Sequence, residues 1–315
     1  MSDNSSPLGL LTVPNPRGSS YVQTKQPKSL GQMVELMRDR GLAVENEREL
    51  ESALFDCNYY RLSGYFRVFQ EDPAHGVNKF HTGVRVDDFI HPYRMDSRLR
   101  ELILHGTALI ELTLRSRFAY LAAMHGGAYT YANLSAYQDR RNRTGVEMRE
   151  GLLTNIGKWV SMSSEVCIRH YRKRGAEIPI WAAVEVLPFD TVSRMLSLYS
   201  DTAVLRELYR SFNIRTNLRT ASEIVHAMVY LRNLCSHHSR LWHREMVIAS
   251  PVTKDMRSSY PDFDYEEKSV AGSLMALMYL VDSINGDNAY SRSVLDLIHE
   301  RDDYLDGIVH PLHWE

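Results

Sequence analysis

A short stretch near residue 235 concentrates side chains that can carry acid–base and phosphate chemistry. In RNLCSHHSRLW (232–242), Arg232, Asn233, His237 and His238 stand close together. A histidine with a pKa near neutrality can take a proton from a ribose 2′-hydroxyl or give one to a leaving oxygen. Arginine keeps its charge and grips phosphate with a planar fork, and asparagine can hold an imidazole in one orientation. Together these residue types predict metal-free cleavage of RNA.

The spacing alone, an arginine followed after four to six residues by a histidine, is weak support for such a site. It occurs seven times in this chain, Arg219 and His226 included, against roughly four matches expected by chance from the composition. Only at Arg232 does an asparagine follow the arginine and a second histidine follow the first. The context therefore carries the prediction.

The stretch is expected to lie on one long helix. Apolar residues recur at helical spacing from Ile224 to Trp242, and Ser222 is a suitable N-cap. On that helix Asn233, His237 and Arg240 would share one face, with Arg232 about a hundred degrees away. Arg232 and His237 would then meet one phosphate only if the helix loosened near its end or the arginine reached around.

Two other segments hold candidate supporting residues. The longest periodic stretch, 86–124, predicts a central helix. On that helix Glu111 and Arg115 stand four residues apart, the spacing of an ion pair. The pair would either support the histidine site or lie on the surface, where it would contribute little. A second segment, NYYRLSGYFRVF (58–69), concentrates aromatic rings and arginines that either bind RNA or divide between core and solvent. Its candidate RNA contacts are Tyr59, Tyr60, Arg61, Tyr65 and Arg67.

The composition limits the classes of function. A formal net charge of −2 gives no global basicity, so an RNA site would have to be a local basic patch. Three scattered cysteines favour a reducing cytoplasm over a disulfide framework. We find no signal peptide and no apolar run long enough to span a membrane. Neither metal nor cofactor is expected, because no carboxylate or cysteine accompanies the histidine pair at ligand spacing on one face.

The hydrophobic pattern is helical throughout, and Trp181 is expected in the core, with Glu185 as a buried partner for an arginine. We expect a flexible leader over 1–28 and one helical domain over 29–310. Within that domain, 29–80 would form a helical hairpin and the aromatic segment, 81–245 the core with the motif, and 246–310 a linker and closing helices. Single helices are expected over 146–174, 196–212 and 291–308.

The residues described so far resemble one protein family. RNLCSHHSRLW is similar to the RNxCxHHxRLW signature of the Abi-like abortive-infection proteins, the AbiD/AbiF group of the HEPN superfamily. NYYRLSGYF (58–66), the block at 80–120 and IPIWAAVEVLPFDTVSRML (178–196) resemble further family segments in the same order. The sequence departs from the family pattern at Asp190, often a glycine, and at His243, often an asparagine.

This resemblance implies an all-α, HEPN-like helical bundle with additional helices and an anti-phage endoribonuclease. Arg232 would stabilise the phosphorane, His237 would act as acid or base, Asn233 would orient it, and Arg240 would support the site. His238 would be a second acid or base, a phosphate donor or a packed residue. Because HEPN ribonucleases pair two motifs, one copy per chain implies a homodimer. The alternative is a binding module that holds a structured small non-coding RNA, or a partner protein, without cutting it.

Overall fold

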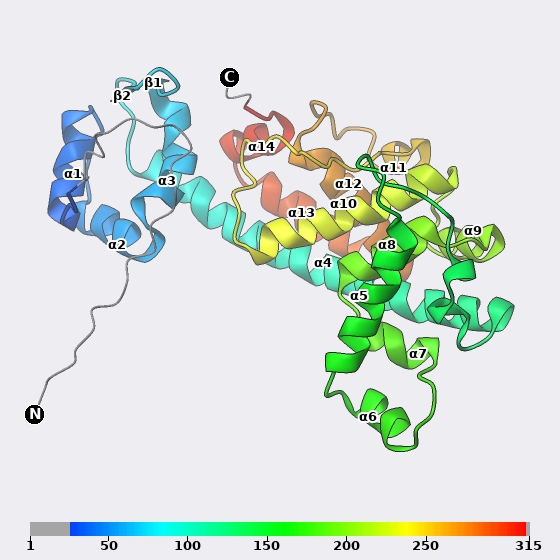
Figure 1. The fold of residues 1–315 in the computed structure, drawn as a ribbon. Coiled ribbons are helices and arrows are strands. Elements are labelled where there is room, and N and C mark those ends of the chain that lie inside the picture. Colours follow the sequence, from blue (N-terminus) through cyan, green and yellow to red (C-terminus); the bar gives the residue numbers. More distant parts are fainter. Residues whose placement is uncertain (1–25, 313–315) are drawn as a thin grey trace, which may run out of the picture.

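The computed structural model describes residues 26–312, so the expected leader lies largely outside the described residues. The described chain is mostly helical, with one short two-stranded sheet (Figure 1). The fold class expected from the hydrophobic pattern, all-α, is therefore confirmed. No helix of the described chain combines the length and the apolar character needed to cross a membrane.

The molecule is organised along α4 (Asp87–Gly126), a helix of 40 residues. Leu99, Ile103, Ile110 and Leu114 are buried along one side of it, because they recur at the spacing that places side chains on one helical face. The helix stops where Gly127 takes a positive φ of 90°, a conformation that is open to glycine. The sequence prediction of a central helix is confirmed.

The N-terminal unit lies at the beginning of α4 (Figure 1). It contains α1 (Leu30–Asp39), α2 (Glu47–Cys57), α3 (Tyr59–Phe66) and the antiparallel strands β1 (Gln70–Asp72) and β2 (Val77–Phe80). A capping box between Ser29 and Gln32 starts α1, and the Asn46 side chain caps α2. The expected helical hairpin is therefore confirmed, with the aromatic segment placed on α3.

Helix α10 (Leu218–Ser236) packs along α4. Arg100 of α4 donates a hydrogen bond to the Ser239 carbonyl just after α10, at 3.3 Å. Farther along α4, Arg117 donates to the Ser211 carbonyl just before α10, at 2.5 Å. The two helices therefore run antiparallel, with the helix that carries Arg232 beside the helix that carries Arg115.

A ring of further helices closes the core around α4 and α10. The most apolar of them, α12 (Val270–Asn285), packs on both. The others on this side are α9 (Thr202–Arg210), α11 (Lys254–Ser259), α13 (Ala289–Ile298) and α14 (Asp302–Val309).

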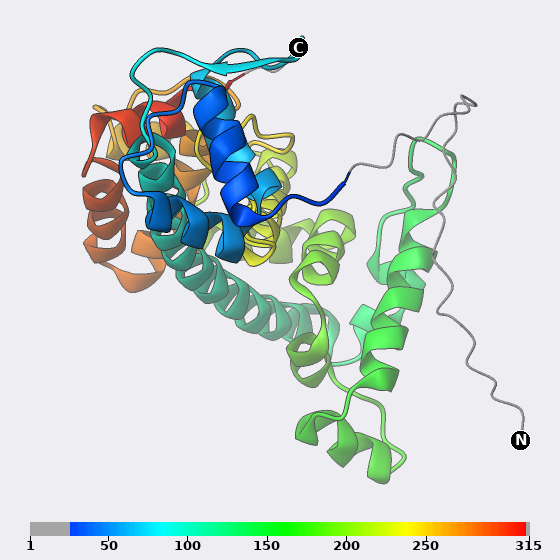
Figure 2. The same ribbon diagram turned by 90° about the vertical axis from the view of Figure 1, so that its left-hand side faces the viewer.

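An arm of four helices projects from this body (Figures 1 and 2). It consists of α5 (Met148–Met162), α6 (Val166–Lys173), α7 (Ile180–Ala183) and α8 (Phe189–Leu198), with α8 packed against both α5 and α10. Four 3-10 turns complete the part of the chain that the structure describes: η1 (Arg67–Phe69), η2 (Thr130–Ala132), η3 (Leu134–Ala136) and η4 (Val184–Val186).

Three helices expected to be continuous are each divided in two. The 146–174 stretch breaks at 163–165, where the Ser163 hydroxyl accepts the Glu165 N–H and the backbone is extended. The 196–212 stretch breaks before Thr202, because the Asp201 side chain caps α9. The 291–308 stretch breaks at Arg301, which is extended with φ −149°. Local capping overrode a periodic pattern in the first two cases.

Candidate functional site

The helix that carries the motif begins and ends earlier than the sequence predicted. Its N-cap is Asn217, whose side chain accepts the Thr220 N–H at 2.9 Å, so the prediction of Ser222 as the cap is wrong. Its last residue is Ser236. The predicted apolar stripe is buried from Ile224 to Cys235. Arg232 and Asn233 therefore lie on the last turns, and the histidines follow the helix.

The two histidines form the turn that terminates α10. His237 is the C-cap, and its N–H bonds to the Asn233 carbonyl at 3.0 Å. His238 has a φ of 52°, in the left-handed region where glycine is usual. The His238 N–H bonds to the Cys235 carbonyl and the Ser239 N–H bonds to the Leu234 carbonyl. These two bonds are the Schellman pattern of a helix end.

Because the chain leaves the helix here, Arg240 does not share a helical face with Asn233 and His237. That part of the sequence interpretation is wrong. The histidine side chains are both exposed, whereas Arg240 is half-buried. Burial lowers the pKa of Arg240, and its Nη1 atom is buried without a hydrogen-bond partner in the described chain.

A buried carboxylate fixes the chain immediately after the turn. Asp96 of α4 is fully buried and accepts the backbone N–H of Leu241 at 2.7 Å and of Trp242 at 3.2 Å. The hydroxyls of Tyr65 and Tyr304 donate to the same carboxylate at 2.7 and 2.8 Å. Burial raises the pKa of Asp96, and these hydrogen bonds oppose that rise. Asp96 thus holds the motif against α3, α4 and α14, and the sequence analysis missed it.

The turn and α3 together line a pocket of about 520 Å³. His237, His238, Ser239 and Arg240 form one wall, and Tyr60, Arg61, Gly64 and Tyr65 form much of the other. Arg61 donates to the His238 carbonyl at 2.5 Å and so ties the walls together. The structure therefore brings part of the aromatic segment to the histidine pair, although 177 positions separate Arg61 from His238.

The five candidate RNA contacts of the aromatic segment fall in different environments. Tyr60 is 74% exposed and Arg61 is exposed, both at the pocket. Tyr59 is half-buried, and its hydroxyl is bonded by Arg40 at 2.7 Å. Tyr65 is only 2% exposed, so the expectation that it stacks on a base is wrong. Arg67 lies outside this pocket and donates to the Pro73 carbonyl at 3.0 Å.

Arg232 faces a different neighbour from the histidines. It does not line the histidine pocket, and its guanidinium lies over the ring of Phe189, at 5.8 Å from the ring centre. Phe189 begins α8. Arg232 is half-buried, and its Nε atom finds no hydrogen-bond partner among residues 26–312. Asn233 is also half-buried and does not line the pocket.

The Glu111–Arg115 pair lies on the Phe189 side of the molecule. Arg115 bonds to the Glu111 carboxylate and also donates to the Leu187 carbonyl at 2.6 Å. The pair is largely shielded from solvent, so the alternative of a surface pair is wrong. It ties α4 to the chain just before Phe189, the ring under Arg232. Arg115 thus supports Arg232 indirectly.

Two expectations about the segment before Phe189 are wrong. Trp181 is 50% exposed, so it is not a core residue. Glu185 is exposed, and the Glu185 atom nearest to Arg115 is its backbone carbonyl, at 3.5 Å, rather than its carboxylate. Residue type alone does not reveal which side of a short helix faces solvent.

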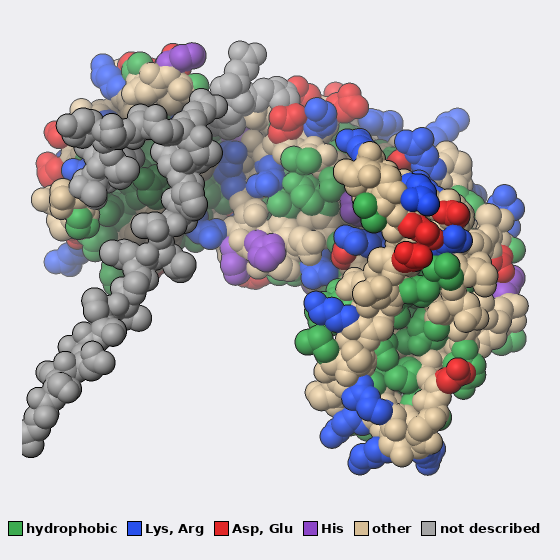
Figure 3. Space-filling model, in the orientation of Figure 1, with side chains coloured by type: hydrophobic (Ala, Val, Ile, Leu, Met, Phe, Trp, Pro, Cys, Tyr) green, Lys and Arg blue, Asp and Glu red, His purple; other side chains and the backbone are tan. Residues whose placement is uncertain are grey.

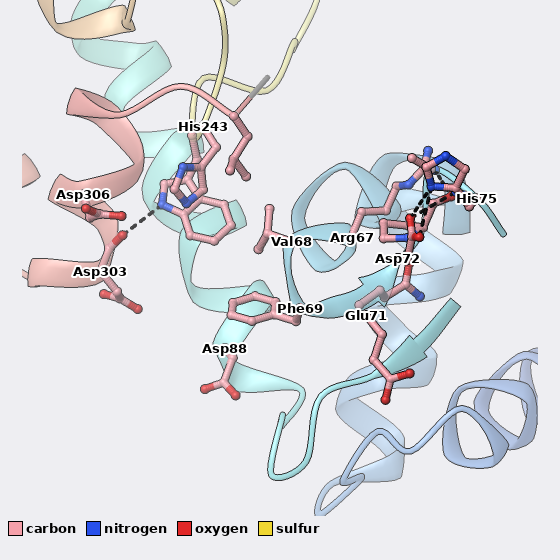
Figure 4. Close-up of a pocket in the computed structure, with 15 residues that line it drawn as sticks. Arg67, Val68, Phe69, Glu71, Asp72, His75, Asp88, His243, Asp303 and Asp306 are labelled. Atoms are coloured by element: carbon pink, nitrogen blue, oxygen red, sulfur yellow. Dashed lines mark hydrogen bonds and ion pairs between the residues drawn. The ribbon is translucent and has the colours of Figure 1, made fainter. Parts of the chain in front are cut away.

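A larger pocket, of about 740 Å³, lies on another part of the surface (Figure 4). Val68 and Phe69 face Trp242 and His243 across it, and its other residues include Arg67, Glu71, Asp72, Asp88, Asp303 and Asp306. Five carboxylates against one arginine repel phosphate. This pocket is therefore unsuited to RNA, and the smaller pocket at the histidines is the candidate site. In the described chain, no group of three or more His, Cys, Asp and Glu side chains has the arrangement of a metal site.

Comparison with known protein families gives one match, and it includes the motif. A family model described as Abi-like protein matches residues 52–243, which extend from α2 to the residue after Trp242 and include the histidine pair. No curated protein and no solved structure matches the chain. Since the matched region covers more than half of the sequence, the chain belongs to the Abi-like family.

Proposed function

We propose that this protein is a metal-independent HEPN-type endoribonuclease acting in anti-phage defence. Membership in the Abi-like family indicates a role in abortive infection. The observation that carries the ribonuclease proposal is the pocket at the end of α10, where two exposed histidines stand beside Arg61 and Arg240.

The pocket offers the acid and base groups for cleavage of an RNA phosphodiester. One imidazole removes the proton from the ribose 2′-hydroxyl, and the 2′-oxygen attacks the adjacent phosphorus. The bond from phosphorus to the 5′-oxygen breaks, and a second imidazole protonates that oxygen. The products are a 2′,3′-cyclic phosphate and a 5′-hydroxyl. Arginine neutralises the extra charge on the phosphorane.

We assign His237 as the principal acid or base because its side chain is exposed at the pocket and its backbone is fixed by Asn233. Tyr60 offers an exposed ring on which an unpaired base can stack. Arg61 and Arg240 stand where they can hold phosphate.

The position of Arg232 favours a site shared by two chains. Arg232 is directed to Phe189 rather than into the pocket of its own chain. We assign the phosphorane-stabilising role to Arg232 of a second copy, placed across a two-fold axis so that each pocket receives one arginine. The protein is then active as a homodimer.

The chain contains its own matched control for these roles. Arg219 and His226 stand on the same helix with a similar spacing, both are exposed, and neither lines the pocket. Arg232→Ala and His237→Ala should each abolish cleavage of total RNA, with His238→Ala less severe. Arg219→Ala and His226→Ala should cleave like the wild type.

Gel analysis of RNA after equal incubation measures this. Equal activity in Arg232→Ala and the wild type would contradict the role assigned to Arg232. If the wild-type protein binds RNA but never cleaves it, the protein is instead a module that holds RNA without cutting it.

A further inference from the structure

The free end of the projecting arm carries a concentration of positive charge. Between positions 158 and 174 the chain has five basic residues and one acidic residue, Glu165, although its overall net charge is −2. Lys and Arg side chains gather over α6 on the face shown in Figure 3, where histidine side chains gather at the end of α10. The end of the arm and the candidate site are therefore presented on one face of the molecule.

Several exposed arginines elsewhere in the structure are neutralised by a carboxylate. Arg38, Arg94 and Arg98 each form an ion pair with a glutamate. At the end of the arm, Lys158, Arg169 and Lys173 are all exposed, and no acidic side chain in the described part of the chain pairs with them. Arg169 and Lys173 stand four residues apart on α6, and Lys158 lies near the end of α5, to which α6 is joined. Unpaired cations that share a surface raise the local electrostatic potential and attract a polyanion.

Not every basic residue of the arm is free to bind. Arg172 donates to the carbonyls of Val160 and Ser161, both at 2.9 Å, and so joins α6 to the end of α5. Arg174 bonds to His170 at 2.7 Å. Arg172 thus supports the surface. Arg172 and Arg174 keep their charge but their side chains already have partners, whereas Lys158, Arg169 and Lys173 have no acidic partner in the described chain.

An aromatic side chain accompanies the unpaired cations. Trp159 is 37% exposed, and the Lys158 ammonium lies 5.9 Å from its ring centre. A cationic side chain beside an exposed ring is the combination that single-stranded nucleic acid binds, with phosphate on the cation and a base stacked on the ring.

From these observations we infer that the surface formed by Lys158, Trp159, Arg169 and Lys173, here named the arm surface, binds the backbone of single-stranded RNA. The inference rests on the proposed function, because the arm surface would hold the same RNA whose scissile bond lies in the pocket. Phosphate contacts fix position without reading sequence, so the arm surface adds affinity and not base preference.

The test is binding of a fluorescent, single-stranded 2′-O-methyl RNA of mixed sequence, followed by anisotropy over a range of salt concentrations. This RNA has no 2′-hydroxyl, so it reports binding whether or not the protein cleaves. The variant is Lys158→Gln/Arg169→Gln/Lys173→Gln. The matched control is Arg48→Gln/Arg206→Gln/Arg210→Gln, which removes three exposed charges from α2 and α9.

For each binding curve we plot the logarithm of the binding constant against the logarithm of the salt concentration. The slope of this plot should decrease in magnitude by about 2 in the arm variant, because each of the three lost phosphate contacts accounts for about 0.7. The control should retain the wild-type slope. A Trp159→Ala variant should weaken binding with an unchanged slope, because stacking releases no counterions. Equal slopes in the arm variant and the wild type would overturn the inference.

Two further outcomes separate this inference from other readings. If the arm variant loses binding to phosphatidylcholine vesicles containing phosphatidylserine but retains RNA binding, the arm surface is a membrane surface and the inference is wrong. If the arm variant shows the reduced RNA slope while the wild type cleaves no RNA, the arm surface stands and the ribonuclease proposal fails.

Discussion

At the scale of single residues, His238 occupies a backbone conformation that does not suit it. Its φ of 52° falls where a Cβ atom crowds the following carbonyl, and a glycine would relieve that contact. Keeping a histidine there costs stability, and strain of this kind gathers at functional sites.

Replacing His238 with glycine should therefore stabilise the fold while it damages the site. His238→Gly should raise the free energy of unfolding by about 1 kcal/mol, since the left-handed conformation costs an ordinary residue about 1–2 kcal/mol. Urea denaturation measures the change. His238→Ala retains the Cβ atom and should bring no gain, so a gain as large as that of glycine would contradict this explanation.

His243 is a residue whose titration should affect stability. It is half-buried, and its Nδ1 donates to the His310 carbonyl at 2.9 Å. Burial lowers the pKa of His243 from its ordinary 6.5. The unfolded chain therefore binds the proton more readily than the folded protein, and stability falls as the pH drops through the unfolded pKa.

His243→Asn should remove that part of the pH dependence. Asparagine tolerates the positive φ of 51° at this position and has an amide that can donate to the same carbonyl, but it does not titrate. The difference in free energy of unfolding between pH 8 and pH 5.5 should be smaller in the variant. An unchanged difference would show that His243 is not the responsible group.

At the scale of elements, Asp96 is the point where separate segments meet. It joins Tyr65 of α3, Tyr304 of α14 and the backbone of Leu241 and Trp242 to α4. Asp96→Ala would leave two buried hydroxyls and two backbone N–H groups without an acceptor. The free energy of unfolding should fall by about 3–5 kcal/mol.

The exposed Arg98–Glu300 pair, also anchored on α4, provides the comparison. Arg98→Ala should lower the free energy of unfolding by less than about 1 kcal/mol, because solvent screens exposed ion pairs. If Asp96→Ala lowers the free energy of unfolding no more than Arg98→Ala does, Asp96 does not hold these segments together.

The sequence predicted these elements better than it predicted their ends. The apolar spacing located α4 and the buried stripe of α10, because burial imposes that spacing directly. The end of α10 was not predicted, because His238 takes the left-handed conformation at the position where a glycine usually marks the end of a helix. The bond between Arg61 and the His238 carbonyl could not be anticipated, because no local pattern encodes a contact between distant segments.

At the scale of the whole molecule, the proposed site needs two chains. Within one chain Arg232 lies over Phe189 and does not line the pocket that His237 lines, and for this reason we propose that the partner chain supplies the arginine. Light scattering at working concentration should show a dimer.

Mixing inactive Arg232→Ala and His237→Ala proteins should restore activity. After subunit exchange, half of the dimers are mixed and each has one complete site of two, which gives about a quarter of the wild-type rate. No recovery, despite confirmed exchange, would mean that arginine and histidine must come from the same chain.

The central claim is that the end of α10 cuts RNA without a metal. The measurement that tests it most directly is incubation of purified protein with RNA in excess EDTA, followed by analysis of the new ends. We expect cleavage in EDTA, with 2′,3′-cyclic phosphate and 5′-hydroxyl ends, and no cleavage by His237→Ala. Cleavage that stops in EDTA, or that leaves 3′-hydroxyl and 5′-phosphate ends, would contradict it.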